Sequence, residues 1–242
     1  EAGMALSRRD FVKLCSGTVA GFGVSQMFHP AIHEAFAQTL TGERPPVFWV
    51  QGQGCTGCSV TLLNSTHPSI ADVLLKIISL EFHPTVMAAE GEGAYEHMMR
   101  VAEKFKGKFI FAVEGAVPVA HDGKCCVVAE ANHHEVTMTE VTKVLAANAA
   151  AVLAVGTCAA YGGIPAGKGN ETGAMGVSAF LKKEGIPAPV INIPGCPPHP
   201  DWIVGTIGLG LQALATNTLG LLVKHLPDRW KLQMLPGKLL HD

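Results

Sequence analysis

The chain has 242 residues, of which 48% are hydrophobic and only 16% are charged. This length allows one sizeable hydrophobic core, and the small share of charged residues is typical of an α/β domain that buries surface against a partner. The net charge of −2, without a basic stripe interleaved with aromatic residues, excludes nucleic acid as a partner.

Residues 1–37 carry the features of an export signal. The twin-arginine run Arg8-Arg9 is followed by an apolar stretch over Leu14–Phe28 and then by a small-residue processing site. These features predict a twin-arginine signal peptide, with residues 38–46 as a linker behind it. Because this route carries folded proteins, we expect a protein that reaches the periplasm with its cofactor already inserted. The alternative is an exposed amphipathic helix at the N-terminus.

From Val47 onward, short apolar runs alternate with amphipathic segments. Strands are predicted at Val47–Gln51, Ser79–Phe82, Lys108–Glu114, Lys124–Ala129, Ala151–Val155 and Val190–Ile193. Helices are predicted at Ser59–Asn64, Ile70–Ile78, Gly93–Phe105, Glu135–Ala147, Gly176–Glu184 and from about Asp201. Strands that alternate with helices pair in parallel, so we expect an α/β fold with a flavodoxin-like, doubly wound parallel sheet over residues 47–205. The order of the strands does not follow from this pattern.

The last part of the chain differs in character. The stretch Ile203–Val223 contains no charged residue and is long enough to cross a bilayer, but its polar residues and glycines favour a buried helix followed by a loop. The sequence therefore does not indicate membrane association. Residues 206–242 are interpreted as a divergent C-terminal segment.

Four cysteines form a metal-binding pattern. Cys55 and Cys58 are a C-x2-C pair, whereas Cys158 and Cys196 stand alone further along the chain. The pair and each single cysteine come after a predicted strand, and the loops that leave the carboxyl ends of parallel strands converge on one crevice. We therefore expect these loops to bring all four thiolates into one site at that edge of the sheet.

Four thiolates suit either a [4Fe–4S] cluster or a tetrahedral zinc ion. Structural zinc sites usually combine two close pairs of cysteines, whereas this chain offers one pair and two single residues, which favours the cluster. Cys125 and Cys126 are neighbours in a predicted strand, where their side chains would point to opposite faces. We interpret both as buried structural thiols.

Several motifs then follow in a fixed order. They are Cys55-Thr-Gly-Cys58, Glu81-Phe-His-Pro-Thr-Val-Met87, Val113-Glu-Gly-Ala-Val-Pro118, Gly156-Thr-Cys158 with Tyr161-Gly-Gly163, and Pro194-Gly-Cys-Pro-Pro-His-Pro-Asp-Trp202. With the twin-arginine signal, this series closely resembles the small subunit of periplasmic [NiFe] hydrogenases. The run Gln51-Gly-Gln-Gly54 lacks the acidic residue that most of these subunits carry before the first cysteine, and in this it is similar to the nickel–iron–selenium subgroup.

The resemblance implies a division of labour between two subunits. Cys55, Cys58, Cys158 and Cys196 would hold the proximal [4Fe–4S] cluster, next to the Ni–Fe centre of a separate large subunit. The chain would transfer electrons between that centre and an acceptor, for which a periplasmic c-type cytochrome is expected, and it would have no hydrogenase activity without its large subunit. No catalytic residue is expected in this chain. Glu114 and Glu81 are candidates for a proton- or water-bearing network, or else satisfied interface carboxylates.

The resemblance weakens toward the C-terminus. No cysteine follows Cys196, although small subunits of this family continue into a segment with a medial and a distal cluster. His241 falls where the family places a histidine ligand of the distal cluster, but without partner thiols it is not assigned as a ligand. We expect a truncated fragment, with a natural one-cluster variant as the alternative.

Two other functions stay open on the sequence alone. One is an iron–sulfur subunit of a quinone reductase related to respiratory complex I, against which the C-x2-C pair and the export signal argue. The other is a zinc-stabilised binding module without enzymatic activity.

Overall fold

The structure is a computed structural model, and it describes residues 44–66 and 68–215. The twin-arginine signal, most of the linker, His241 and the rest of residues 216–242 lie outside the described residues. Within the described part, no helix is both long and apolar enough to cross a membrane. Residue 205, where we predicted the domain to end, lies inside a helix that continues to Ala215.

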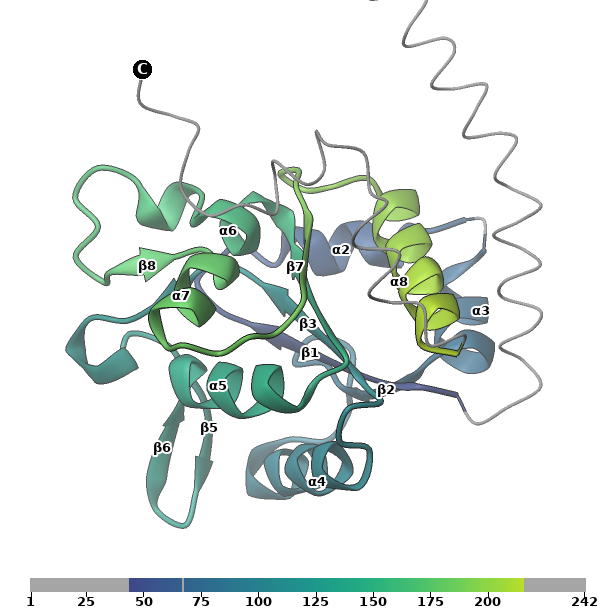
Figure 1. Ribbon diagram of the computed structural model, residues 1–242, viewed down its shortest axis with the longest axis horizontal. Coiled ribbons are helices and arrows are strands. Elements are labelled where there is room, and N and C mark those ends of the chain that lie inside the picture. The colour runs from purple at the N-terminus through teal and green to yellow at the C-terminus, as the bar shows by residue number, and fades with distance from the viewer. Residues whose placement is uncertain (1–43, 67, 216–242) are drawn as a thin grey trace, which may run out of the picture.

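A five-stranded parallel sheet forms the centre of the domain (Figure 1). Its strand order is β2-β1-β3-β7-β9, and every neighbouring pair is parallel. Because the chain places its first strand inside the sheet and then builds outward in both directions, this is the predicted doubly wound, flavodoxin-like α/β fold. The bounds are β1 Pro46–Gln51, β2 Ser79–Phe82, β3 Ile110–Glu114, β7 Ala151–Val155 and β9 Val190–Ile193.

Side chains alternate between the two faces of the sheet along each strand, so both faces carry apolar side chains. Helices cover both of these faces. Phe48 and Val50 face one core, which α4, α5 and α7 cover, whereas Val47 and Trp49 face a second core under α2 and α8 (Figure 1). The bounds are α2 Gly57–Leu63, α3 Ile70–Asp72, the π-helical turn η1 Val73–Ile77, α4 Gly91–Lys104, α5 Met138–Asn148, α6 Gly156–Tyr161, α7 Val177–Lys183 and α8 Pro200–Ala215. Short 3-10 turns lie at η2 His121–Gly123 and η3 Ile164–Ala166.

One predicted strand pairs outside the main sheet. Lys124–Ala129 was expected to be a sheet strand, but the structure has a hairpin of β5, Val127–Ala131, and β6, His134–Thr137. Asn132 and His133 both adopt positive φ, which gives the tight turn between the two strands. Helix α5 therefore begins at Met138 rather than Glu135.

Two smaller features also differ from the sequence-based expectation. A two-residue pair, β4 Val117–Pro118 with β8 Ala174–Met175, was not predicted. Cys125 is exposed and Cys126 is half-buried, because both precede β5 and lie outside the alternation of a strand. The prediction that both are buried thiols is therefore wrong for Cys125.

Candidate metal centre

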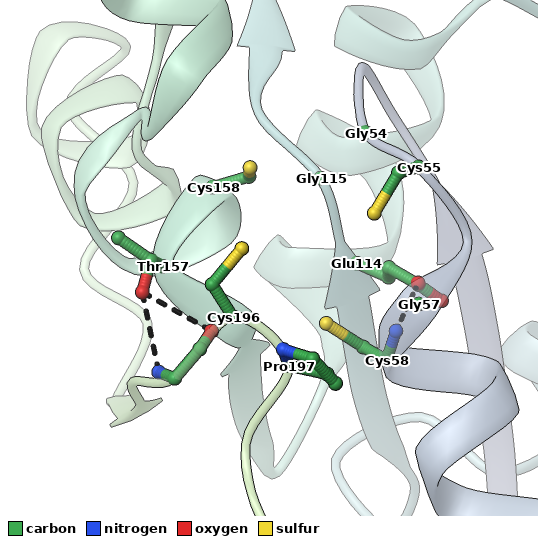
Figure 2. Close-up of a pocket in the computed structure, with 11 residues that line it drawn as sticks. Gly54, Cys55, Gly57, Cys58, Glu114, Gly115, Thr157, Cys158, Cys196 and Pro197 are labelled. Atoms are coloured by element: carbon green, nitrogen blue, oxygen red, sulfur yellow. Dashed lines mark hydrogen bonds between the residues drawn. The ribbon is translucent and has the colours of Figure 1, made fainter.

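The four cysteines line one pocket at the carboxyl ends of β1, β3, β7 and β9. Cys55 and Cys58 follow β1, Cys158 follows β7 and Cys196 follows β9, so the parallel sheet brings them together as expected from the sequence. The space between its lining residues, together with the open solvent at its mouth, amounts to about 300 Å³. Figure 2 shows the sulfurs of Cys55, Cys58 and Cys196 turned toward this common space.

The sequence pattern predicted that all four cysteines lie in loops, but the structure places two of them in helices. Cys58 and Cys158 belong to the first turns of α2 and α6, and only Cys55 and Cys196 lie in connecting segments. Helix α6 begins directly after β7, so nothing separates this strand from its helix. The helices fix two of the four thiols in position, whereas Cys55 and Cys196 are exposed.

Gly156 allows two cysteine-bearing segments to approach each other. Its φ of +86° is in the left-handed region, and a Cβ on this residue would overlap the sulfur of Cys58. Behind it, the Thr157 amide donates to the carbonyl of Gly195 (2.8 Å), and the Gly195 amide donates to Thr157 Oγ1 (3.2 Å). The ends of β7 and β9 are therefore joined next to the sulfurs.

The electrostatics of the pocket suit a positively charged group. Burial raises the pKa of Cys58 to about 12, and the negative charges of Glu114, Cys55 and the other two cysteines add to this effect. Burial also raises the pKa of Cys158. Because a thiolate is the form that binds metal, these thiols would act as ligands only if a metal centre supplied compensating positive charge.

The four thiols of the pocket are the donor set of either a structural zinc ion or an iron–sulfur cluster. A tetrahedral zinc site with Zn–S distances near 2.3 Å needs sulfurs about 3.8 Å apart. Within residues 44–66 and 68–215, no three Cys, His, Asp or Glu side chains converge closely enough to hold one metal ion. A cluster of irons and sulfides spans a larger volume than one ion, and the four cysteines that line this pocket supply the thiolates that it needs.

Glu114 lies at the end of β3 and lines the pocket, and it is only 3% exposed. Its carboxylate accepts hydrogen bonds from the amides of Cys58 (2.9 Å) and Ser59 (3.2 Å). It also accepts from Trp49 Nε1 (3.0 Å), Gln51 Nε2 (3.2 Å) and the Ser59 hydroxyl. Of the two candidate acidic residues, this is the one that contacts a cysteine of the site.

Glu81 lies elsewhere. Its carboxylate accepts a hydrogen bond from Ser79 Oγ and pairs with His97 Nε2 at 2.8 Å, which links β2 to α4. It does not line the pocket.

Sequence reasoning missed four side chains around Glu114. Trp49, Gln51 and Ser59 bond it directly, and His83 contacts Ser59. Gln51 and His83 belong to sequence runs on which the resemblance rests, and Ser59 directly follows Cys58. Only the tertiary contacts show that these residues belong to one hydrogen-bonded network around Glu114.

Comparisons with known proteins agree with this geometry. The family model described as "NADH ubiquinone oxidoreductase, 20 Kd subunit" matches residues 55–209, which include all four cysteines. The periplasmic [NiFeSe] hydrogenase small subunit of Desulfomicrobium baculatum is 57% identical, over 84% of this chain and 66% of that protein. The periplasmic [NiFe] hydrogenase small subunit of Solidesulfovibrio fructosivorans is 36% identical, over 98% of this chain and 68% of that protein.

Solved structures give the same result. A chain of the recombinant [NiFeSe] hydrogenase from Desulfovibrio vulgaris Hildenborough superposes with a TM-score of 0.76 at 69% identity, covering 79% of this chain and 69% of that one. The chain spans about half to two-thirds of the length of the first curated relatives it matches. It belongs to the NADH ubiquinone oxidoreductase 20 Kd subunit family and, within it, to the small subunits of periplasmic [NiFe] and [NiFeSe] hydrogenases.

Proposed function

We propose that this chain is the electron-transfer subunit of a hydrogenase and that its four pocket cysteines hold one [4Fe–4S] cluster, in the proximal position. The observation that carries the proposal is the convergence of Cys55, Cys58, Cys158 and Cys196 on one pocket at the carboxyl ends of the sheet. When bound, such a cluster accepts and releases one electron at a time. The role of this chain is to bind it, to limit its contact with water and to set its potential through nearby charges and amides.

A large subunit that carries the Ni–Fe site is the partner we propose for the face around the pocket. Cys55 and Cys196 are exposed there, and exposed cluster ligands need a cover. Large apolar side chains are also exposed on the two helices that carry cysteines and on two elements that follow cysteines in the chain: Val60 and Leu63 on α2, Tyr161 on α6, Ile164 on η3 and Trp202 on α8. An apolar surface of this kind, around a cofactor site, is typical of a protein–protein interface.

The periplasm is the proposed location. Several relatives, including those of D. baculatum and S. fructosivorans, are named periplasmic hydrogenase small subunits, and Arg8-Arg9 with the apolar stretch behind it fits twin-arginine export of a folded protein. A periplasmic c-type cytochrome is the acceptor we propose for the electrons.

Two alternatives have less support. The zinc-stabilised module fits the cysteine pattern less well, because structural zinc sites usually combine two close pairs of cysteines, whereas this chain has one pair and two single cysteines. The quinone-reductase subunit is compatible with the family model, but the identities of 57% and 69% are with hydrogenase chains of the [NiFeSe] type.

Iron and acid-labile sulfide per chain, measured after anaerobic purification, test the proposal together with EPR of the reduced protein. We expect about four of each and a reduced [4Fe–4S] signal. Cys158→Ser should lose the cluster, whereas the matched control Cys126→Ser, outside the pocket, should keep it. Stoichiometric zinc without sulfide, or full iron content in Cys158→Ser, would contradict the ligand assignment.

A further inference from the structure

A buried hydrogen-bonded chain leads from His83 to the candidate cluster site. His83 Nε2 lies 3.3 Å from Ser59 Oγ, the Ser59 hydroxyl donates to Glu114 Oε2, and Glu114 Oε1 accepts from the Cys58 amide at 2.9 Å. Ser59, His83 and Glu114 are 0%, 1% and 3% exposed. This series of hydrogen bonds therefore runs through the interior of the protein and ends on a cysteine of the pocket.

The partners of His83 fix the direction of these hydrogen bonds. The Thr85 amide donates to His83 Nδ1 (3.2 Å), so this nitrogen is an acceptor and carries no proton. In the neutral ring the proton is then on Nε2, which donates to Ser59 Oγ. The Ser59 hydroxyl is left with its own proton to donate to Glu114, as its geometry shows. Burial lowers the pKa of His83 to about 4, which keeps the ring neutral near pH 7.

Trp49 contacts both His83 and Glu114. Its ring stacks on the His83 ring, with centroids 5.3 Å apart and an angle of 21° between the planes. Its Nε1 donates to Glu114 Oε2 at 3.0 Å. One buried side chain thus positions the histidine and one oxygen of the carboxylate.

All the donors to Glu114 named above are neutral groups. Among the described residues, no lysine or arginine forms an ion pair with it. Backbone amides, an indole, a carboxamide and a hydroxyl stabilise a carboxylate without cancelling its charge. A negative charge that is held against Cys58 favours the more oxidised, less negative state of a bound cluster.

We propose that His83 and Ser59 are positioning residues that keep Glu114 oriented against the Cys58 amide and thereby lower the reduction potential of the cluster. The inference rests on the proposed function, because it requires a cluster on the four cysteines. It assigns His83, which lies outside the pocket, a role in electron transfer through two intervening side chains.

Redox titrations of the complete anaerobic enzyme, followed by EPR, test this inference in four variants. Glu114→Gln removes the charge and should raise the midpoint potential by about 59 mV or more, a tenfold change in the ratio of oxidised to reduced cluster for one electron. His83→Phe keeps a ring against Trp49 but removes the donor, and it should raise the potential by a smaller amount. His83→Gln restores a donor and should return the potential toward wild type. The double variant His83→Phe/Glu114→Gln should match Glu114→Gln alone, because both changes act through one carboxylate.

His97→Phe is the matched control, because it removes a histidine that pairs with Glu81 outside this network. Its midpoint potential should equal that of wild type. If His83→Phe is not recovered folded, the pair Ser59→Ala and Ser59→Thr tests the same link at the next residue, with the shift expected only in the alanine variant.

The outcomes separate the inference from the proposed function. Wild-type potentials in Glu114→Gln and His83→Phe, with full iron content, would overturn the inference and leave the proposed function standing. A shift of equal size in His97→Phe would also overturn it. A wild-type protein without iron and sulfide would overturn the proposed function, and this inference with it.

Discussion

Gly156→Ala offers the sharpest test of how the fold makes room for the proposed cluster. The residue has a φ of +86°, where an alanine costs about 1–2 kcal/mol relative to its usual conformations. In addition, the new Cβ would overlap the sulfur of Cys58. Relieving that overlap moves the sulfur by on the order of 1 Å, well beyond the tolerance of roughly 0.2 Å for metal–ligand distances.

Gly169→Ala separates the two effects. Gly169 has a φ of +85°, almost the same as Gly156, but a Cβ there meets nothing within 4 Å. It should cost the same 1–2 kcal/mol, a fall in Tm of about 2–8 °C for a chain of this size, and keep its cluster. Gly156→Ala should show at least that fall in Tm and also lose most of its iron and sulfide, measured per chain after anaerobic purification. Equal iron content in the two variants would refute the argument that Gly156 makes room for the Cys58 sulfur.

Three further predictions concern stability and the acidic residues. Burial lowers the pKa of His83 from its usual 6.5 to about 4, so between these pH values the unfolded chain binds a proton that the folded chain does not. His83 should therefore lower the free energy of unfolding by on the order of 3 kcal/mol as the pH falls from 6.5 to 4. In denaturant unfolding at a series of pH values, His83→Phe should reduce this loss of stability, and an unchanged loss would contradict the lowered pKa. Thr137→Ala removes the capping box of α5 and should lower the free energy of unfolding by about 1 kcal/mol, with Val144→Ala on the exposed face as a control for a mild surface change. Glu81→Gln should leave iron content and midpoint potential unchanged, because Glu81 pairs with His97 away from the pocket; a shifted potential would show that it acts on the cluster.

The main elements of the fold could be predicted because their signals are local. The strands β1, β7 and β9 stand in the sequence as short apolar runs, and the helix over Val177–Lys183 ends before Gly185. The hairpin β5–β6 was missed because its turn depends on two residues, Asn132 and His133, that adopt positive φ without a glycine. The expectation of a buried Cys125 failed for a related reason, since β5 begins only at Val127.

The candidate site divides in the same way. Cys55, Cys58, Cys158 and Cys196 could be assigned to one place because each follows a strand, and parallel strands align their carboxyl ends whatever their order. Choosing between Glu114 and Glu81 was beyond the sequence, because both stand at the end of an apolar run or within one. Glu114 is placed by β3 lying between β1 and β7, whereas β2 is an edge strand and directs Glu81 toward α4.

The sequence by itself therefore determined the class of fold, the meeting of four cysteines at one edge of the sheet and the family, since these depend on residue types, spacing and periodicity along the chain. The tertiary structure alone decided the strand order, the place of Glu114 in the pocket and the buried contacts that join His83, Ser59 and Glu114. The physical reason is that such contacts link residues 24 and 55 positions apart, as between Ser59 and His83 and between Ser59 and Glu114. No local pattern encodes them, because they exist only once the sheet has brought the ends of its strands together.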